Sequence, residues 1–315
     1  MTTRKPFGPE GWTPAQLGSL AGKTFVITGA NAGAGFQATR ILLSKGASVV
    51  MMNRNADKSA AAIAALKQEF GGDAGVSDVH MDLAVLDSVR KAAAELLEKV
   101  PRIDALICNA AIAQVAKQEI TVDGFESQLG VNHFGHFLLT GLLFERIEES
   151  RGRIVVVGSN AYKMGLKRIQ FDDLNFDKRY TAWNSYAQSK LAQMIFAYEL
   201  QRRIRAAGKN VQVHVCHPGA SRTNLLKDTA SCFNKVVWAI LSRIIAQSAG
   251  KGAWPEVMCA TQDGLQPESL YGPTKRAQTV GPVDECPLDP VALDRESAAR
   301  LWTVSEQKTE LTWTL

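Results

Sequence analysis

The sequence predicts a single α/β domain with a doubly wound, mostly parallel sheet of seven strands and a C-terminal substrate-capping region. The chain has 315 residues, which is within reach of one large α/β domain. Hydrophobic residues make up 46% of it, enough for a large core. Short Val- and Ile-rich runs alternate with helical patterns, as in right-handed βαβ units whose sheet is covered on both faces.

The elements follow in order along the chain. The seven expected strands are compact and apolar: Thr24–Thr28, Ser48–Met52, Val76–His80, Ala105–Cys108, Arg153–Gly158, Val211–Cys216 and Ser269–Tyr271. Helical patterns lie between and after them, at Phe36–Lys45, Asp57–Phe70, Leu86–Lys99, Trp183–Arg205 and Asp294–Gln307.

We expect residues 1–20 to be an N-terminal extension and 21–315 to form the domain. Within the domain, the rhythm changes after residue 220. A variable substrate cap is expected at about 222–265 and a C-terminal extension at about 272–315. The apolar stretch Val236–Ala246 fits a packed helix, a mobile lid over an apolar pocket, or a face that touches a membrane or a partner subunit.

Composition excludes several classes of protein. The net charge is +5, with no basic run and no interleaved aromatic array, so no nucleic-acid partner is expected. The five cysteines form no CxxC pair, which favours a reducing compartment. The N-terminus lacks the apolar core of a signal peptide, and no apolar run approaches the ~18 residues of a membrane span. We therefore expect a cytoplasmic protein without an integral membrane segment. His133 and His136 have metal-ligand spacing but no further ligands nearby, so no metal site is expected.

A glycine-rich turn follows the first strand. Gly29, Gly33 and Gly35 stand where the strand turns into a helix, and their backbone would approach a pyrophosphate on the helix N-terminus. Asn31, Ala32 and Ala34 lie between the glycines and would contact the same group. The TGxxxGxG spacing differs from GxGxxG, and a glycine-rich turn without a nucleotide is the alternative. With this turn, the predicted sheet is a Rossmann fold.

The end of the second strand indicates which dinucleotide would bind. An NAD site usually has a carboxylate there to accept from the ribose 2′-hydroxyl. This chain has Arg54 instead, and a guanidinium suits a 2′-phosphate. NADP(H) is favoured over NAD(H), and a solvated surface arginine is the alternative.

A tyrosine and a lysine lie four residues apart in a helical pattern. Tyr186 and Lys190 therefore share one helix face, and a fixed positive charge would lower the pKa of the phenol. YxxxK alone carries little information, but Ser159 directly follows a probable strand. Ligands bind at the carboxyl ends of such strands, so Ser159 could orient a substrate oxygen toward Tyr186.

Two asparagines lie near the same edge of the sheet. Asn109 follows the fourth strand, and we expect it to make a structural hydrogen bond to backbone, with cofactor contact as a consequence. Asn132 lies among apolar residues in a long helix, where its amide needs a partner or a water.

In this order, the residues resemble the short-chain dehydrogenase/reductase family over about residues 20–225. The matching set is Thr28-Gly29, Gly33, Gly35, Asp82-Leu83, Asn109-Ala110-Ala111, Asn132, Ser159, Tyr186, Lys190, Pro218-Gly219 and Thr223. The resemblance implies that Tyr186 is the general acid/base and that Ser159 binds the substrate oxygen. It gives the ribose hydroxyls to Lys190, makes Tyr186 a cofactor contact as well, and gives a proton-relay water to Asn132.

The same resemblance implies the remaining cofactor contacts. Asp82, with Leu83 beside it, would contact the adenine, and Ala110 would lie against the dinucleotide. Thr223, after Pro218 and Gly219, would meet the nicotinamide amide.

Within that family, the sequence is most similar to the retinol-dehydrogenase-like group. The similar stretches are Phe171–Phe176, Ser185–Ala192 and His133–His136, together with Arg54. The resemblance implies NADP(H), a small lipophilic alcohol, aldehyde or ketone as substrate, carbonyl reductase activity, and a homodimer or homotetramer whose contacts an extended C-terminus can block.

Two departures and two alternatives stay open at this point. Asn109-Ala-Ala replaces the more usual Asn-Ala-Gly, and Ala32 stands where many NADP(H) members have a basic residue. Light-dependent protochlorophyllide reductases share some of these motifs and reduce a C=C bond, but Ser159 and the short spacer before Tyr186 argue against that group. A non-catalytic NADP(H)-binding regulator is the other alternative.

Overall fold

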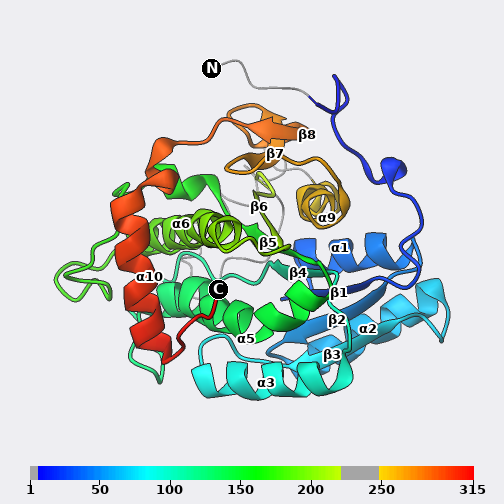
Figure 1. Ribbon diagram of the computed structural model, residues 1–315, viewed down its shortest axis with the longest axis horizontal. Helices are drawn as coiled ribbons and strands as arrows, with labels where there is room; N and C mark the ends of the chain where they lie inside the picture. The colour runs from blue at the N-terminus through cyan, green and yellow to red at the C-terminus, as the bar shows by residue number, and fades with distance from the viewer. Residues whose placement is uncertain (1–5, 221–247) are drawn as a thin grey trace.

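A computed structural model describes residues 6–220 and 248–315, and these residues form a single eight-stranded sheet flanked by helices (Figure 1). The strand order is β3-β2-β1-β4-β5-β6-β7-β8. The strands are β1 (Thr24–Thr28), β2 (Ser48–Asn53), β3 (Val76–His80), β4 (Ala105–Cys108), β5 (Arg153–Val157), β6 (Gln212–Cys216), β7 (Leu270–Lys275) and β8 (Val280–Cys286). The first seven pair in parallel, as a doubly wound sheet requires. The predicted fold class is confirmed.

The expected strand count was one too low. β8 pairs antiparallel with β7 at the edge of the sheet, in the region that was expected only to be a C-terminal extension. Gly281 and Pro282 interrupt its apolar pattern, and edge strands tolerate proline because one side of the ladder has no partner strand. β7 also runs four residues beyond the predicted end at Tyr271, and its pairing with β8 shifts register between Pro273 and Lys275.

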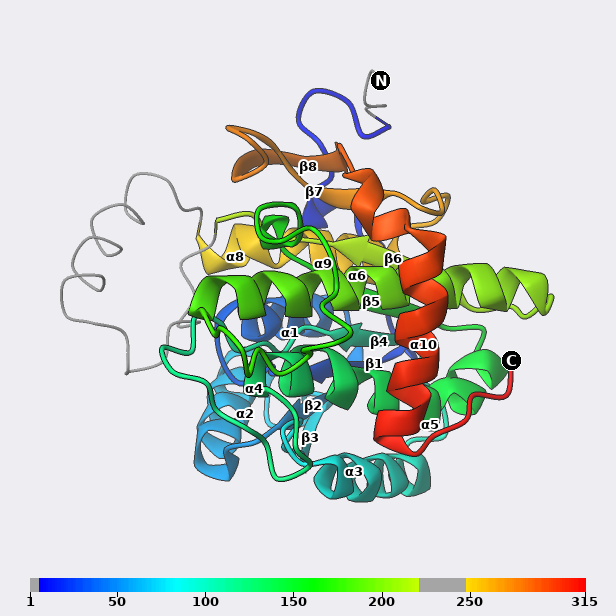
Figure 2. The ribbon, with the colours of Figure 1, turned by 90° about the vertical axis from the view of Figure 1, so that its left-hand side faces the viewer.

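Two helical layers cover the sheet (Figures 1 and 2). Helices α1, α2 and α9 form one layer and share one core cluster with the sheet. Helices α3, α5, α6 and α10 form the other layer and share a second core cluster with it. Their bounds are α1 (Gly33–Leu43), α2 (Ala56–Phe70), α3 (Leu86–Lys99), α4 (Ser127–Leu129), α5 (Gly135–Glu149), α6 (Ala182–Ala206), α8 (Ala249–Gly252), α9 (Trp254–Thr261) and α10 (Arg295–Thr309). A π-helical turn, Gly130–Phe134, joins α4 to α5. Short 3₁₀ helices cover Pro14–Gln16, Asn160–Lys163 and Pro290–Leu293.

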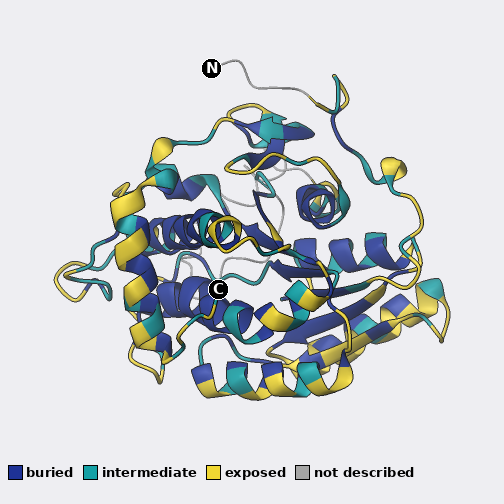
Figure 3. Ribbon diagram, viewed as in Figure 1, coloured by how far each residue is buried: buried dark blue, intermediate teal, exposed yellow. Residues whose placement is uncertain are grey.

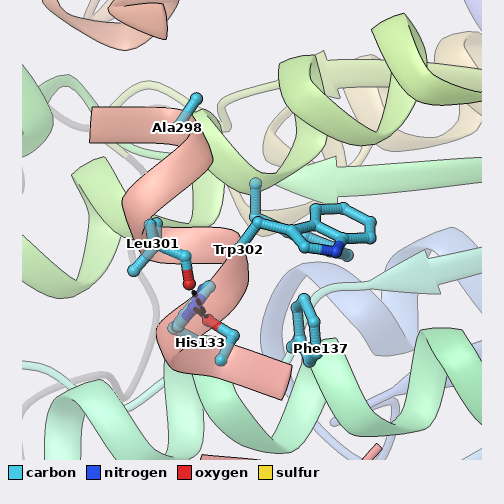
Figure 4. Close-up of a pocket in the computed structure, with 7 residues that line it drawn as sticks. His133, Phe137, Ala298, Leu301 and Trp302 are labelled. Atoms are coloured by element: carbon cyan, nitrogen blue, oxygen red, sulfur yellow. Dashed lines mark hydrogen bonds between the residues drawn. The ribbon is translucent and has the colours of Figure 1, made fainter. Parts of the chain in front are cut away.

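Aromatic side chains fasten the C-terminal helix α10 to α5 and α6. The Trp302 ring lies 5.4 Å from Phe137, 6.0 Å from Phe196 and 5.1 Å from Trp313. The space among these side chains is too small to hold a water molecule, and beside it His133 Nε2 is hydrogen-bonded to the Ser305 hydroxyl (Figure 4). This part of the core therefore offers no room for a substrate.

Helix α9 begins near the carboxyl ends of the parallel strands, which we call the carboxyl edge of the sheet. The carbonyl of Gln262 and the carboxylate of Asp263, just after α9, both accept from Arg153 at the start of β5. The helix therefore runs antiparallel to β5, from the carboxyl edge of the sheet to the amino edge. Most residues of α9 are buried, as the dark blue colour of this helix in Figure 3 shows.

Much of the expected cap lies outside the described residues, including the stretch 236–246 considered as a helix, lid or contact face. The described remainder, α8 and α9, packs against α1 and the central strands. No described helix is long and apolar enough to cross a membrane.

Candidate active site

The glycine turn has the geometry that a bound dinucleotide requires. Gly29 has φ of +67° and Gly33 of +61°, which favour glycine. A Cβ on Gly29 would lie 2.9 Å from the Ala110 Cα, and one on Gly35 would lie 2.5 Å from the Asn109 Nδ2. Bare of side chains at Gly29 and Gly35, the turn packs directly against Asn109 and Ala110 at the end of β4.

The first turn of α1 is free to bind an anion. Ala32 precedes the helix and supplies no side-chain cap to its N–H groups, which include those of Ala34 and Gly35. Helix N-termini of this kind bind phosphate through these N–H groups and the helix dipole. The residues present thus fit a dinucleotide phosphate.

Asn53 holds this turn, and the sequence analysis gave it no role. Its Oδ1 accepts from the N–H groups of Ala30 and Asn31 at 2.7 and 3.3 Å, so the last residue of β2 fixes the turn after β1. The Asn53 side chain is buried, and its Nδ2 has no partner among the described residues. A polar residue ending an otherwise apolar strand was the available signal.

Arg54 follows β2 and is exposed at the same edge. Its backbone carbonyl accepts from His80 Nε2 at 2.8 Å, which ties its main chain to β3. Its guanidinium has no acceptor in residues 6–220 or 248–315, so it is available to an anion.

Asp82, Leu83 and Asn109 shape the edges of the cofactor region. Asp82 accepts from the Ala84 N–H at 2.9 Å and so caps its own turn, while Leu83 is buried. Asn109 donates through Nδ2 to the carbonyls of Thr28 and Gly29 at 2.8 and 3.1 Å. This is the structural hydrogen bonding to backbone that the sequence analysis expected of Asn109.

Ser159 and Tyr186 meet at the carboxyl end of β5. Ser159 follows β5 after one glycine, and its Oγ accepts from the Ala161 N–H at 3.3 Å. Tyr186 lies in the second turn of α6 and is partly exposed. Burial raises the pKa of the Tyr186 phenol, and hydrogen bonding to Ser159 lowers it in part. The serine therefore favours the ionised form of the phenol.

Lys190 lies one helical turn further along α6, and its side chain is 3% exposed. Its Nζ donates to the Val157 carbonyl at 3.0 Å and to Gln193 Oε1 at 2.8 Å. Burial lowers the pKa of Lys190 to about 8.

Burial raises the pKa of the Tyr186 phenol. The Lys190 ammonium is bonded to the carbonyl at the end of β5 instead of to the phenol. The expected lowering of the Tyr186 pKa by Lys190 stays a prediction.

Asn132 acts as a buried brace. Its Oδ1 accepts from the Ile112 N–H at 2.9 Å, and its Nδ2 donates to the Ile112 carbonyl at 3.0 Å and to Ser189 Oγ at 2.9 Å. These bonds connect the loop after β4 to α6, which carries Tyr186 and Lys190. The proton-relay role implied for Asn132 stays a prediction, because its side-chain hydrogen bonds to Ile112 and Ser189 are structural.

The remaining predicted positions are placed as follows. Gly219 has φ of +67°, and a Cβ there would lie 2.4 Å from the Thr279 carbonyl oxygen, so the chain after Pro218 passes close to β8. Thr223 lies outside the described residues. His217 is buried against Gly272, and burial lowers its pKa to about 3, consistent with a packing role.

His133 and His136 also belong to the core. Their pKa values are lowered by burial to about 3 and about 4, and His136 is hydrogen-bonded to Thr28 Oγ1 and to the Asn132 carbonyl. Among the residues with described positions, no group of three His, Cys, Asp or Glu side chains is placed to hold a metal ion.

Comparison with known proteins agrees with this geometry. The family described as "short chain dehydrogenase" matches residues 23–171. Human "Retinol dehydrogenase 14" is 40% identical over 308 residues, which cover 92% of this chain and 87% of that protein. The chain belongs to the short-chain dehydrogenase/reductase family. Human "Retinol dehydrogenase 13", at 36% identity over 91% of the chain and 84% of that protein, supports its retinol-dehydrogenase-like group.

Solved structures of this short-chain dehydrogenase fold are similar to it. A crystal structure of an uncharacterised protein from Mycobacterium paratuberculosis superposes with a TM-score of 0.79 at 39% identity, covering 97% of this chain and all of that one. The "NADPH-Dependent 3-Quinuclidinone Reductase" of Rhodotorula rubra has a TM-score of 0.61 at 18% identity, covering 79% of this chain and 89% of that one, and shows the shared fold alone. The protein is thus an oxidoreductase of the short-chain dehydrogenase/reductase family.

Proposed function

We propose that the protein is an NADP(H)-dependent oxidoreductase that interconverts a hydrophobic alcohol and its aldehyde or ketone by hydride transfer. The observation that carries this proposal is the convergence of Ser159, Tyr186 and Lys190 at the sheet edge that also carries the bare glycine turn. Three elements of distant sequence supply this set: the end of β5, the helix α6 and the β1–α1 turn.

The bound nicotinamide would supply or accept the hydride, and the chain's own residues manage the oxygen and its proton. In the reducing direction, the Tyr186 hydroxyl donates its proton to the oxygen that gains charge, and in the oxidising direction the phenolate takes the proton of the alcohol. The Ser159 hydroxyl donates a hydrogen bond to the same oxygen and orients it. Lys190, one helical turn from Tyr186, would bind the ribose hydroxyls of the cofactor.

Arg54 supports NADP(H) as the cofactor. A guanidinium with no acceptor among the described residues stands at the end of β2, where a 2′-phosphate would lie. A guanidinium and a 2′-phosphate form charge-assisted hydrogen bonds, which the uncharged ribose hydroxyl of NAD cannot form with Arg54.

Exposed apolar side chains beside Tyr186 support a lipophilic substrate. The Trp183 ring lies 6.4 Å from the Tyr186 ring and is 38% exposed. A Cβ on Gly165 would lie 2.5 Å from the Ala187 Cβ, which brings its neighbour Met164, 63% exposed, to the same region. Exposed apolar groups that gather around a polar catalytic set are typical of a binding site for an apolar ligand. The relatives named retinol dehydrogenases carry a lipophilic alcohol in their names.

Two further proposals concern the setting. The four described cysteines, Cys108, Cys216, Cys259 and Cys286, are free and buried, which supports a reducing, cytoplasmic location. We also propose a homodimer or homotetramer, assembled through faces other than the part of α5 and α6 that α10 covers.

The test is a screen of NADPH and NADH oxidation, and of the reverse reaction, with lipophilic aldehydes, ketones and alcohols. The proposal predicts turnover of at least one carbonyl with NADPH. Tight NADPH binding without turnover of any compound would instead support a non-catalytic regulator, and reduction of a conjugated C=C bond alone would point to the reductase alternative.

A further inference from the structure

A glutamate that the site described above does not use is fully buried behind Lys190. Glu256 lies in the first turn of α9 and has 0% of its surface exposed. Neither Oε1 nor Oε2 has a hydrogen-bond partner among the described residues. Carboxylates are rarely buried this completely without a partner, since desolvation of the charged form is costly.

The fold places Glu256 on the other side of the end of β5 from Lys190, without a hydrogen bond between the two side chains. Lys190 Nζ is bonded to the carbonyl of Val157, whose Cα is in register with Cys216 on β6. The thiol of Cys216 interacts with Cys259 on α9, one turn after Glu256. Because α9 runs from the carboxyl edge of the sheet to the amino edge, Glu256 is nearer than Cys259 to the edge where Lys190 lies.

The electrostatics of the two groups agree with this placement. Burial raises the pKa of Glu256 to about 8, and Lys190 is the one charged group that lowers it. Glu256 is in turn the largest of the influences that raise the pKa of Lys190 against its burial.

We propose that Glu256 is a positioning residue that keeps the Lys190 ammonium charged at the end of β5, one helical turn from Tyr186. Glu256 touches neither substrate nor cofactor and acts through Lys190. Gln193 lies beside the same ammonium. Its Oε1 accepts a hydrogen bond from Lys190 Nζ, and its buried Nε2 has no hydrogen-bond partner among the described residues.

The physical reason is that a buried lysine loses its charge easily. A carboxylate nearby stabilises the ammonium and raises the pH at which the proton is lost. Three groups raise the pKa of Lys190 from the elements packed around it: Glu256 on α9, Cys216 on β6 and Cys108 on β4. The charge of Lys190 in turn lowers the pKa of His136 on α5. The two thiols and the imidazole stay uncharged as Lys190 approaches the pH at which it loses its proton, whereas Glu256 ionises in that same pH range and can stabilise the ammonium.

The experiment compares Glu256→Gln with the wild type over pH 6–10 and measures both NADPH affinity and kcat/KM. Gln keeps the shape of the side chain and removes its charge, so Lys190 should lose its proton at lower pH. The pH at which NADPH affinity and kcat/KM fall on the alkaline side, the alkaline limb, should therefore decrease by about one unit or more. Glu256→Asp keeps the charge and should restore a limb close to the wild-type position. Glu199→Gln, on α6 but toward the amino edge of the sheet, is the matched control and should leave the limb in place.

This inference rests on the role of Lys190 in the proposed function, and the two fail separately. If the wild type binds NADPH but turns over nothing, the proposed function fails, while the pH dependence of NADPH affinity still tests Glu256. If the wild type turns over a carbonyl and Glu256→Gln has an unshifted alkaline limb in both profiles, the role of Glu256 is wrong. Should Glu256→Gln not fold, Glu256→Asn against Glu256→Asp makes the same comparison.

Discussion

Replacing Asn132 with alanine tests whether this residue braces the site or only passes protons. The change removes the amide that satisfies both the N–H and the carbonyl of Ile112, in a place where Asn132 itself is fully buried. Each backbone group left without a partner costs about 1–3 kcal/mol, so the free energy of unfolding should fall by about 2–6 kcal/mol. That is a large share of the ~5–15 kcal/mol by which typical proteins are stable.

The assay is equilibrium urea unfolding followed by the fluorescence of the chain's six tryptophans. Ser189→Ala is the matched control. It removes one hydrogen-bond partner of Asn132 and leaves Ile112 satisfied, so it should cost only about 1 kcal/mol. A loss below about 1 kcal/mol in Asn132→Ala, together with lost turnover, would refute the bracing role and favour a proton relay.

Two other perturbations probe the cofactor edge and the buried imidazoles. Arg54→Asp should weaken NADPH binding about 10- to 100-fold relative to NADH, as loss of charge-assisted hydrogen bonds to a 2′-phosphate requires, and an unchanged ratio of the two dissociation constants would remove the argument for NADP(H). The pKa values of His133, His136 and His217 are lowered by burial to about 3, 4 and 3, so the unfolded state binds more protons below its ordinary histidine pKa of ~6.5. Their contribution to stability is present above that pH and is lost as pH falls toward 4. The urea midpoint should therefore drop between pH 7 and pH 5, and a constant midpoint would contradict the neutral buried imidazoles.

The sequence predicted the central strands because they carry an uninterrupted apolar signal. Residues such as Val155 and Val156 on β5 are buried on both faces of a parallel sheet, and nothing along the chain competes with that reading. β8 escaped prediction because Gly281 and Pro282 give it the composition of a loop. Only its pairing with β7, itself set by packing at the sheet edge, makes it a strand.

Some parts of the candidate site could likewise be predicted from the sequence, and others could not. Tyr186, Lys190 and Ser159 could be chosen from spacing and from their place relative to predicted elements, and the structure brings them to one edge. The nearness of Glu256 to Lys190 could not be predicted, because it depends on how α9 crosses the sheet. In the sequence, Glu256 in Trp-Pro-Glu-Val reads as an acidic residue at a helix start, and no local pattern shows that it is buried.

The most direct test of the account is single-turnover reduction by Tyr186→Phe, with the NADPH affinity of the same variant measured in parallel. The proposed chemistry uses the phenolic proton, and phenylalanine removes only the hydroxyl while it keeps the ring and its contacts. We predict that hydride transfer to a carbonyl found in the screen falls at least about 100-fold, the lower end of what a general acid contributes, while NADPH binds as before. Near-normal transfer by this variant would contradict the central claim that the Tyr186 hydroxyl is the proton donor.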